Sequence, residues 1–410
     1  MFFHRNSKSK LEKALKISPV VLLTGARQTG KTTLMNEVAK DRGYFSASFD
    51  DLSMLSAAKA DPMGFIARLP KPVILDEVQR VPEIFLAIKH EVDQNREAGM
   101  FALTGSTNPL LIPRLGDSLA GRMIILTLLP LSQGELLGRK EVFIDRLFKG
   151  EIPYTVEVLS RQELYGRILK GGYPVVQGFS EEERRLWFNS YITALLQKDV
   201  QDLAHVTALA EFPRILQLLA TRAANLLNVA ELSRAVGIPN TTLHRYLSLL
   251  EALFIVSLLQ PWSVNIGKRL VKSPKIYLID SGILAFLLGI DNERALVDGK
   301  LMGSIIENFV VMELIKQATW STTSVQLFYF RTQTGVEVDL VLEDKAGNII
   351  GIEVKSSSTV TQQDFKGLRY LQESAGEKFI VGIVLYTGSQ SIPFGSSLYA
   401  LPLTSLWAEF

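Results

Sequence analysis

Residues 25–32 read Gly-Ala-Arg-Gln-Thr-Gly-Lys-Thr and fit the pattern G-x-x-x-x-G-K-[ST]. The apolar run VVLLT at 20–24 precedes this stretch, and a helical pattern follows it. A glycine-rich turn with a solvent-exposed lysine is the alternative interpretation, but the strand, loop and helix context favours a loop whose backbone N–H groups face phosphate oxygens. The stretch therefore predicts a P-loop.

A P-loop assigns a task to each polar side chain in it. Lys31 would reach the β- and γ-phosphates of a nucleotide, and Thr32 would supply an oxygen to Mg²⁺. ATP and Mg²⁺ are the expected cofactors. The residues expected to surround them are Gly25, Gln28, Thr29, Gly30, Lys31, Thr32 and Thr33.

Two carboxylates follow the apolar run VIL at 73–75. Asp76 is expected to hold Mg²⁺, and Glu77 is expected to polarise the attacking water. Taken alone, such a pair is more often a strand end that meets solvent. Together with a P-loop 44 residues earlier, it predicts hydrolysis of the nucleotide as well as binding.

The run FALT at 101–104 ends in a further group of polar residues. A side chain at this tip would lie between Glu77 and the γ-phosphate and position the water, with Ser106 as the first candidate and Asn108 as the second. The alternative is a polar turn or helix cap before Pro109.

Short apolar runs alternate with helical patterns through the first 130 residues, as expected for buried parallel strands of an α/β sheet. The remaining chain changes character three times. We expect a P-loop α/β core at 1–134, a helical lid or linker at 135–210, a helix-turn-helix with a possible wing at 211–272, and a separate α/β domain at 273–410. The runs expected as strands lie at 20–24, 44–49, 73–76, 101–104, 123–129, 325–330, 336–343, 349–355 and 379–386.

The composition restricts the chemistry further. The 410 residues include no cysteine and four histidines, so a disulfide framework or thiolate metal site is excluded and a metal would have to bind carboxylates. The charged N-terminal stretch and the lack of a long uncharged apolar run predict a soluble, cytoplasmic protein without membrane contact.

The net charge of +2 conceals a basic segment, because residues 205–275 carry eight Lys or Arg against three acidic residues. On the second helix of the helix-turn-helix, Leu243, Leu247 and Leu250 are expected to point inward. Short polar side chains and an arginine suit a helix that reads a DNA groove, although winged helices in ATPases also serve as domain couplers. Residues expected to face outward are Asn240, Thr241, Thr242, His244 and Arg245, and the expected DNA contacts are Arg245, Lys268, Arg269 and Lys272.

The chain resembles bacterial and archaeal two-part AAA+ ATPases, in which an AAA+ module is joined through a winged helix to a C-terminal domain of unknown function that is similar to PD-(D/E)XK nucleases. The matching stretches are GARQTGKTTL, VILDEVQRVPEIF, LTGST, SLAGR, LPLSQGEL, GGYP, KIYLIDSGIL, GSIIENFVVMEL and EVDLVLEDKAGNIIGIEVKSS. The resemblance implies an ATPase core, a winged helix-turn-helix and a restriction-endonuclease-like α/β domain.

The same resemblance places an arginine finger at Arg122, which would reach the γ-phosphate of a neighbouring subunit, with Arg114 as the fallback. It therefore implies a homo-oligomer, in the form of a ring that could be a hexamer. The alternative is an ordinary surface arginine before a strand.

The last domain contains a hairpin with alternating acidic residues. Glu337, Asp339 and Glu343 are expected on one face of the first strand, and Glu353 and Lys355 on one face of the second. A D…E-x-K hairpin of this kind is the metal site of PD-(D/E)XK nucleases. A cross-strand pair on a solvated face gives the same pattern.

The nuclease-like site would hold Mg²⁺ or Mn²⁺ on Asp339 and Glu353, with Glu307 helping from its helix. Lys355 would stabilise charge on the scissile phosphate or orient the water. Ser304 and Glu307 also form a capping-box pattern, so Glu307 has a purely structural alternative.

The preferred hypothesis is an ATP-hydrolysing AAA+ protein that acts on DNA, with branched DNA included, and has a nuclease-like C-terminal domain. The alternative is a nucleotide-dependent signalling switch that regulates a protein partner, with a catalytically silent last domain. ATPase activity that is indifferent to DNA would favour the switch.

Overall fold

The computed structural model describes residues 2–40, 42–106, 119–153, 157–197, 211–265, 273–290 and 299–408. The chain divides into two compact units. The first, here the N-terminal unit, comprises Met1–Leu131 and Ala252–Ile255, and the second, here the C-terminal unit, comprises Ser132–Glu251 and Val256–Phe410. Each unit is described separately below.

The N-terminal unit contains a five-stranded sheet in the order β2-β3-β4-β1-β5, with all neighbouring strands parallel. The predicted strands of this unit are present with end shifts of at most two residues. Its strands are β1 (Val20–Thr24), β2 (Phe45–Ser48), β3 (Val73–Asp76), β4 (Phe101–Gly105) and β5 (Met123–Thr127), and its helices are α1 (Lys8–Ile17), α2 (Lys31–Ala39), α3 (Leu52–Ala60), α4 (Pro62–Arg68) and α5 (Ile84–Gln94).

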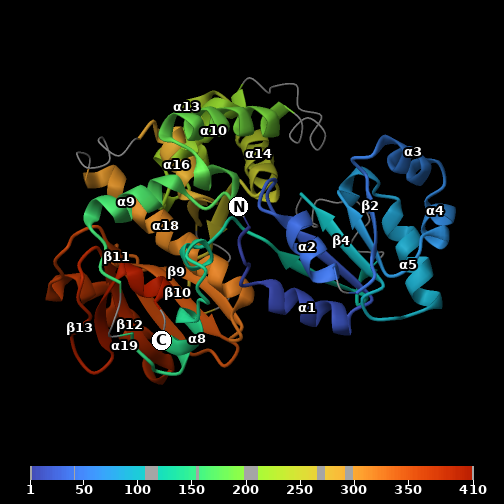
Figure 1. The fold of residues 1–410 in the computed structure, drawn as a ribbon. Helices are drawn as coiled ribbons and strands as arrows, with labels where there is room; N and C mark the ends of the chain where they lie inside the picture. The colour runs from blue at the N-terminus through green and yellow to red at the C-terminus, as the bar shows by residue number, and fades with distance from the viewer. Residues whose placement is uncertain are drawn as a thin grey trace. The chain divides into compact units, whose positions relative to one another are not determined.

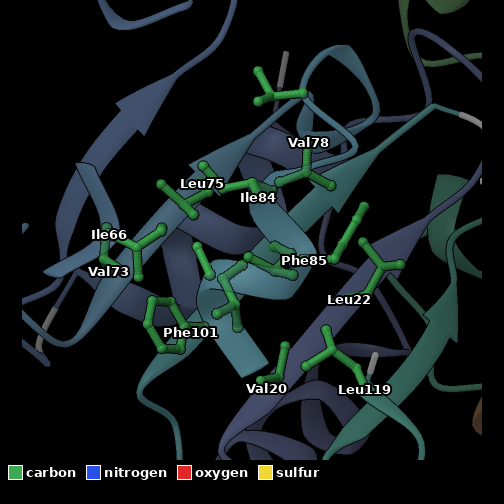
Figure 2. Close-up of a cluster of buried hydrophobic side chains, with 14 of the residues drawn as sticks. Val20, Leu22, Ile66, Val73, Leu75, Val78, Ile84, Phe85, Phe101 and Leu119 are labelled. Carbon is green, nitrogen blue, oxygen red and sulfur yellow. The ribbon is translucent and has the colours of Figure 1, made fainter. Parts of the chain in front are cut away.

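Both faces of this sheet are covered by apolar side chains, which explains why its central strands are continuous apolar runs. One face contributes alternate residues such as Val20, Leu22 and Leu75 to a core completed by α5 (Figure 2). The intervening residues, such as Val21 and Ile74, pack against α1 and α2 on the opposite face. Figure 1 shows the helices of this unit around the sheet in blue and cyan. Apolar cores on both faces of the sheet therefore hold its strands, and with them the strand ends, in position.

The C-terminal unit contains a three-stranded antiparallel sheet, in the order β6-β8-β7, and a six-stranded mixed sheet, in the order β13-β14-β12-β11-β10-β9. Its strands are β6 (Asn225–Leu226), β7 (Val256–Leu259), β8 (Lys275–Leu278), β9 (Val325–Arg331), β10 (Glu337–Asp344), β11 (Ile349–Lys355), β12 (Phe379–Tyr386), β13 (Ile392–Pro393) and β14 (Leu398–Pro402). Its helices include α7 (Gln133–Leu136), α8 (Phe143–Phe148), α9 (Arg161–Lys170), α10 (Glu181–Leu195), α12 (Phe212–Thr221), α13 (Val229–Val236), α14 (Asn240–Ala252), α16 (Ser281–Leu288), α18 (Gly299–Trp320) and α19 (Lys366–Ala375).

The segment that the sequence suggests is a lid or linker packs within the C-terminal unit. The Glu313 carboxylate on α18 accepts a hydrogen bond from the backbone N–H of Gln133 at 2.8 Å, at the start of α7. Asp145 on α8 accepts bonds from Ser321 and from the backbone N–H of Thr323, at 2.7 and 2.8 Å. These contacts attach α7 to the long helix α18, and α8 to the residues that directly follow α18.

The GGYP and LIDSG stretches meet at one buried carboxylate. Asp280 caps α16 by accepting from the N–H groups of Gly282 and Ile283, and its other oxygen accepts from Gly172 N–H at 2.7 Å. A β-carbon at Gly171 would lie 2.2 Å from Asp280 Oδ1, so glycine is required there. Two stretches far apart in sequence are thus joined.

The prediction that Glu337, Asp339 and Glu343 share one face of β10 is wrong. A β-bulge lies between Val338 and Val341, and both valines enter the same hydrophobic core. Glu343 then lies beside Trp262 of that core, accepting its indole N–H at 3.3 Å. An extra residue in a strand moves the side chains beyond it to the opposite face of the sheet.

Among the residues that the structure describes, every helix is too short or too polar to cross a bilayer.

Candidate functional site

The loop between β1 and α2 has the backbone of a phosphate-binding turn. Gly30 lies directly before α2 with φ of 92°, in the left-handed region that favours glycine. A β-carbon at Gly25 would come within 2.1 Å of the carbonyl oxygen of Leu128. These constraints place the loop N–H groups at the N-terminal end of α2, where the helix dipole favours an anion.

Lys31 lies in this turn with only 6% of its surface exposed. Its ammonium donates to the carbonyl oxygens of Gly25 and Ala26, at 3.0 and 2.8 Å. Arg5, which the sequence does not reveal as part of this site, donates to the carbonyl oxygens of Thr29 and Leu129, at 2.7 and 2.6 Å. Arg5 thereby holds the P-loop backbone in place.

Asp76 ends β3 next to the P-loop threonine. Thr32 Oγ1 donates to Asp76 Oδ1 at 3.0 Å, and the Thr104 hydroxyl donates to the same oxygen. Ser48 Oγ lies 3.5 Å from the other oxygen. Hydroxyl and carboxylate oxygens are the ligands that Mg²⁺ prefers, so the side chains of Thr32 and Asp76 fit this ion. The structure therefore brings together Thr32 of the P-loop and the Asp76 carboxylate, both of which the sequence predicts to hold Mg²⁺.

Glu77 adopts a left-handed backbone with φ of 58°, which is uncommon for a residue with a side chain and is often found at functional sites. Its carboxylate accepts from Ser106 Oγ at 3.2 Å. Strand β4 lies between β1 and β3, so its tip brings Ser106 between the P-loop and Glu77. Asn108, the second candidate, lies outside the described residues.

Gln79 is a member of this site that the sequence analysis misses. Its amide N–H₂ donates to Ser106 Oγ at 2.9 Å and to the Glu77 carboxylate. Its Oε1 atom is buried and has no hydrogen-bond partner among the described residues. Gln79 therefore uses both amide protons to connect the two residues expected to position water.

Arg122 lies immediately before β5, whereas the P-loop follows β1. Because β1 and β5 are parallel, with Val20 opposite Met123, Arg122 lies at the opposite edge of the sheet from the P-loop of its own chain. Its guanidinium is paired with Asp93, and the hydrogen bond from Arg122 lowers the pKa of that carboxyl. Arg114 lies outside the described residues.

Helix α14 presents a polar face to solvent. Asn240, Thr241, His244 and Arg245 are exposed, and Thr242 is half-buried. On the opposite face, Leu243, Leu247 and Leu250 are buried. Lys268, Arg269 and Lys272 lie outside the described residues.

In the C-terminal unit, the acidic residues of β10 and α18 surround a lysine. Lys275 at the start of β8 has a side chain that is 3% exposed, and its ammonium bonds to Glu307 at 2.9 Å, to Asp339 at 3.3 Å and to Glu337. Tyr277 donates to the same Glu307 oxygen at 2.9 Å. Helix α18 begins at Gly299, so Ser304 is not its N-cap, and the capping-box alternative for Glu307 is wrong.

The hairpin does bring Asp339, Glu353 and Lys355 together. In the register of β10 and β11, Leu340 faces Ile352, and Asp339 Oδ2 accepts from the backbone N–H of Val354 at 2.9 Å. Lys355 donates to Glu353 Oε1 at 2.8 Å, while Glu353 Oε2 is buried and has no hydrogen-bond partner in the described part of the chain. Burial, followed by the charge of Asp339, raises the pKa of Glu353 to about 8.

These residues do not fit the second metal that the nuclease resemblance implies. Both Asp339 oxygens and one Glu353 oxygen are already engaged, and the Lys275 ammonium supplies a cation to the cluster. Burial and the charge of Asp339 raise the pKa of Glu307 to about 8 as well, while the Lys275 ammonium acts in the opposite direction. Within the described parts of the chain, no group of three or more acidic or histidine side chains is arranged to hold a metal ion. This arrangement therefore does not support the metal-ligand role expected of Asp339, Glu353 and Glu307.

Comparison with known proteins defines the class of the N-terminal unit. Residues 18–137 match a family model described as an AAA domain, and residues 161–294 and 302–406 match two domains of unknown function, DUF8612 and DUF4143. The N-terminal unit is therefore an AAA-type P-loop ATPase domain, and the parallel sheet and P-loop described above agree with this class.

The whole chain has relatives of similar length. It is 32% identical over 401 residues to the uncharacterized protein Rv2008c of Mycobacterium tuberculosis, covering 97% of this chain and 83% of that protein. It is 22% identical over 371 residues to the uncharacterized protein MJ1544 of Methanocaldococcus jannaschii, covering 86% and 79%. The chain belongs to the family of Rv2008c.

Solved structures show weaker likeness. The Walker-type ATPase PABY2304 of Pyrococcus abyssi is 15% identical with a TM-score of 0.40, covering 70% of this chain and 96% of that one. DnaA from Aquifex aeolicus is 17% identical with a TM-score of 0.30, covering 60% and 85%.

Proposed function

We propose that the protein hydrolyses ATP in a Mg²⁺-dependent reaction at the P-loop. One observation carries this proposal: Thr32 Oγ1 donates to Asp76 Oδ1 at 3.0 Å. Beside these two residues, Ser106 donates to the Glu77 carboxylate. Phosphoryl transfer requires charge neutralisation and a positioned water rather than covalent chemistry, and this group of residues supplies both. When bound, Mg²⁺ would neutralise charge on the phosphates. Lys31 would bind the β- and γ-phosphates, and Glu77 would polarise the water.

Two substitutions separate binding from hydrolysis. Lys31→Ala removes the phosphate-binding cation, so nucleotide affinity and turnover should fall together. Glu77→Gln retains the phosphate and metal ligands, so ATP should remain bound while hydrolysis stops. Fluorescent ATP binding and phosphate release would be measured on the same preparations. Hydrolysis at the parent rate by Glu77→Gln would contradict the assignment.

We further propose that copies of the chain assemble so that Arg122 of one acts at the nucleotide of its neighbour. The position of Arg122 at the far edge of its own sheet supports action in trans, since it cannot reach its own P-loop from there. In the single chain Arg122 is paired with Asp93, so assembly would have to exchange this partner. The homo-oligomer and its ring form rest on this proposal.

DNA is the proposed substrate on which the ATPase acts, through the winged helix expected at 211–272. The order of helices and strands supports this proposal, because α12, β6, α13, α14 and β7 follow one another as in a winged helix, and β8, just beyond this range, pairs antiparallel with both β6 and β7. The exposed polar face of α14, with Asn240 and Arg245, supports it further, since such side chains contact base edges and phosphates.

One experiment distinguishes this from a protein-directed signalling switch. The ATPase rate would be measured without DNA and with duplex, single-stranded and branched DNA at matched nucleotide concentration. Stimulation by one form would support action on DNA and identify the preferred form. A rate unchanged by all three, together with no binding at low salt, would favour the switch.

A further inference from the structure

Lys275 is an unusual neighbour for a nuclease-like carboxylate group. It belongs to β8, which pairs with β6 and β7 in the three-stranded sheet, yet its side chain reaches α18 and β10. A lysine with 3% exposure is almost never tolerated unless it is paired, because the cost of removing an ammonium from water is several kcal/mol. Three carboxylates meet that requirement here.

The position of the Lys275 side chain is fixed by the backbone of β8, which is itself held against neighbouring elements. The amide of Asn308 on α18 donates to the Leu278 carbonyl and accepts from its N–H, at 3.0 and 2.8 Å, which fixes β8 against α18. The ring of Tyr329 lies 5.9 Å from the Lys275 ammonium, and its hydroxyl donates to the Ser273 carbonyl at 2.5 Å. The start of β8 is therefore held on both sides.

We propose that Lys275 is the resident cation of the carboxylate cluster and takes the place that a divalent metal has in PD-(D/E)XK nucleases. A nuclease metal must contact the central aspartate, but here one oxygen of Asp339 faces the ammonium and the other accepts from Val354 N–H. An ammonium carries one charge, cannot act as a Lewis acid and cannot bind a water as a ligand. The cluster thus joins β8 to the six-stranded sheet and does not cleave DNA with a metal.

Mn²⁺ titration of the full-length, nucleotide-free protein tests this proposal. All variants would carry Asp76→Asn, so that the nucleotide site does not contribute to the signal. The probe is Mn²⁺ alone, followed by electron paramagnetic resonance up to millimolar concentration. The parent should bind no Mn²⁺ that depends on Asp339, whereas Lys275→Met should gain one site per chain and lose it again when Asp339→Asn is added.

A matched control removes a different cation from the same cluster. Arg331 bonds to Glu337 at 2.9 Å, but it is 42% exposed and lies at the edge of the group. Arg331→Met should therefore open no Mn²⁺ site. A site opened equally by Arg331→Met would show that any loss of positive charge suffices, which would overturn the specific role of Lys275.

The parent protein alone provides the test if Lys275→Met does not fold, as judged by circular dichroism. Mn²⁺ binding by the parent at one equivalent, abolished by Asp339→Asn, would overturn the proposal. No difference between the parent and Asp339→Asn would support it. A folded Lys275→Met protein that gains no site would also overturn it, since the ammonium would then not occupy a metal position.

Discussion

Both units place carboxylates on β-strands close to a buried lysine, but the lysines make opposite use of their charge. In the N-terminal unit, Lys31 donates to two backbone carbonyl oxygens of the P-loop. In the C-terminal unit, Lys275 bonds to three carboxylates. The Lys31 ammonium lies at the N-terminal end of α2, where the helix dipole favours an anionic ligand. The Lys275 ammonium is instead surrounded by acidic side chains of its own unit.

The carboxylates of the two units also differ in the groups that donate hydrogen bonds to them. Asp76 accepts hydrogen bonds from the hydroxyls of Thr32 and Thr104, which are neutral and are themselves suitable metal ligands. Asp339 instead accepts from an ammonium and from a backbone N–H. A motif of acidic residues and a lysine therefore does not define a metal site until the partner of each oxygen is known.

The largest expected effect concerns whether the N-terminal site is complete within one chain. If Arg122 acts in trans, Arg122→Ala should lower the ATPase turnover number by about 10³- to 10⁵-fold, the range measured for arginine fingers. Arg96→Ala is the matched control, because Arg96 is a nearby exposed arginine whose guanidinium donates to the Gly121 carbonyl at 3.0 Å. Its turnover should stay close to that of the parent.

Mixing experiments sharpen this prediction. Arg122→Ala and Glu77→Gln proteins should be inactive separately and partly active when mixed, since hybrid interfaces would combine one intact Glu77 with one intact Arg122. A protein that is monomeric in light scattering and fully active as an ATPase would rule out the arrangement.

The next effect tests whether the C-terminal cluster depends on its lysine. Lys275→Met leaves three carboxylates without their buried partner and should destabilise the C-terminal unit by about 3–5 kcal/mol. Arg331→Met removes a 42%-exposed cation and should cost no more than about 1 kcal/mol. Urea unfolding followed by tryptophan fluorescence would compare the two. Equal midpoints would show that the buried pairing contributes little.

Gln79 provides a smaller effect within the nucleotide site. Gln79→Leu removes the amide that links Ser106 to Glu77, and a misplaced water should lower turnover by about 10- to 100-fold with little change in KM. A fall in nucleotide affinity without a fall in turnover would contradict a positioning role.

Gln79→Glu distinguishes positioning from packing. A second carboxylate beside Glu77 raises the pKa of one member of the pair, because two adjacent negative charges repel. If ionised Glu77 polarises the water as proposed, the acidic limb of the pH–rate profile should move to higher pH in this variant. Gln79→Leu should show no such movement, and an unchanged profile in Gln79→Glu would argue against contact with Glu77.

The predictable parts of this molecule depend on local pattern. Strands β1, β3, β11 and β12 match the sequence expectation residue for residue, because each contains a run of apolar residues that buried strands require. The P-loop is equally local, since two glycines and a lysine at fixed spacing determine its backbone. Strands β13 and β14 are missed because one is two residues long and the other ends in proline.

The remaining features depend on long-range contacts. Lys275 lies 32 residues from Glu307 and 64 from Asp339 in sequence, so no local pattern connects them. The bulge in β10 has no glycine or proline to mark it, and it reverses the facing of Glu343. Gln79 follows Asp76 and Glu77 in a short 3-10 turn, where a polar residue usually meets solvent.

The smallest predicted effect concerns Arg245, a cation that is exposed on α14 rather than enclosed like Lys31 or Lys275. Contacts to phosphate release counterions, so the logarithm of DNA affinity should fall with the logarithm of salt concentration by about 0.9 per phosphate on duplex DNA. Arg245→Gln should flatten this slope by about one unit if Arg245 contacts a phosphate, and the double change Lys268→Ala, Arg269→Ala should flatten it by about two. Lys378→Gln is the control, since Lys378 precedes β12 and donates to the Ala346 carbonyl at 3.0 Å, in the turn between β10 and β11. Fluorescence anisotropy over a salt series would measure all three variants. Equal slopes for Arg245→Gln and Lys378→Gln would exclude a phosphate contact by α14, and DNA binding that is absent at low salt would leave the exposed face of this helix to a protein partner.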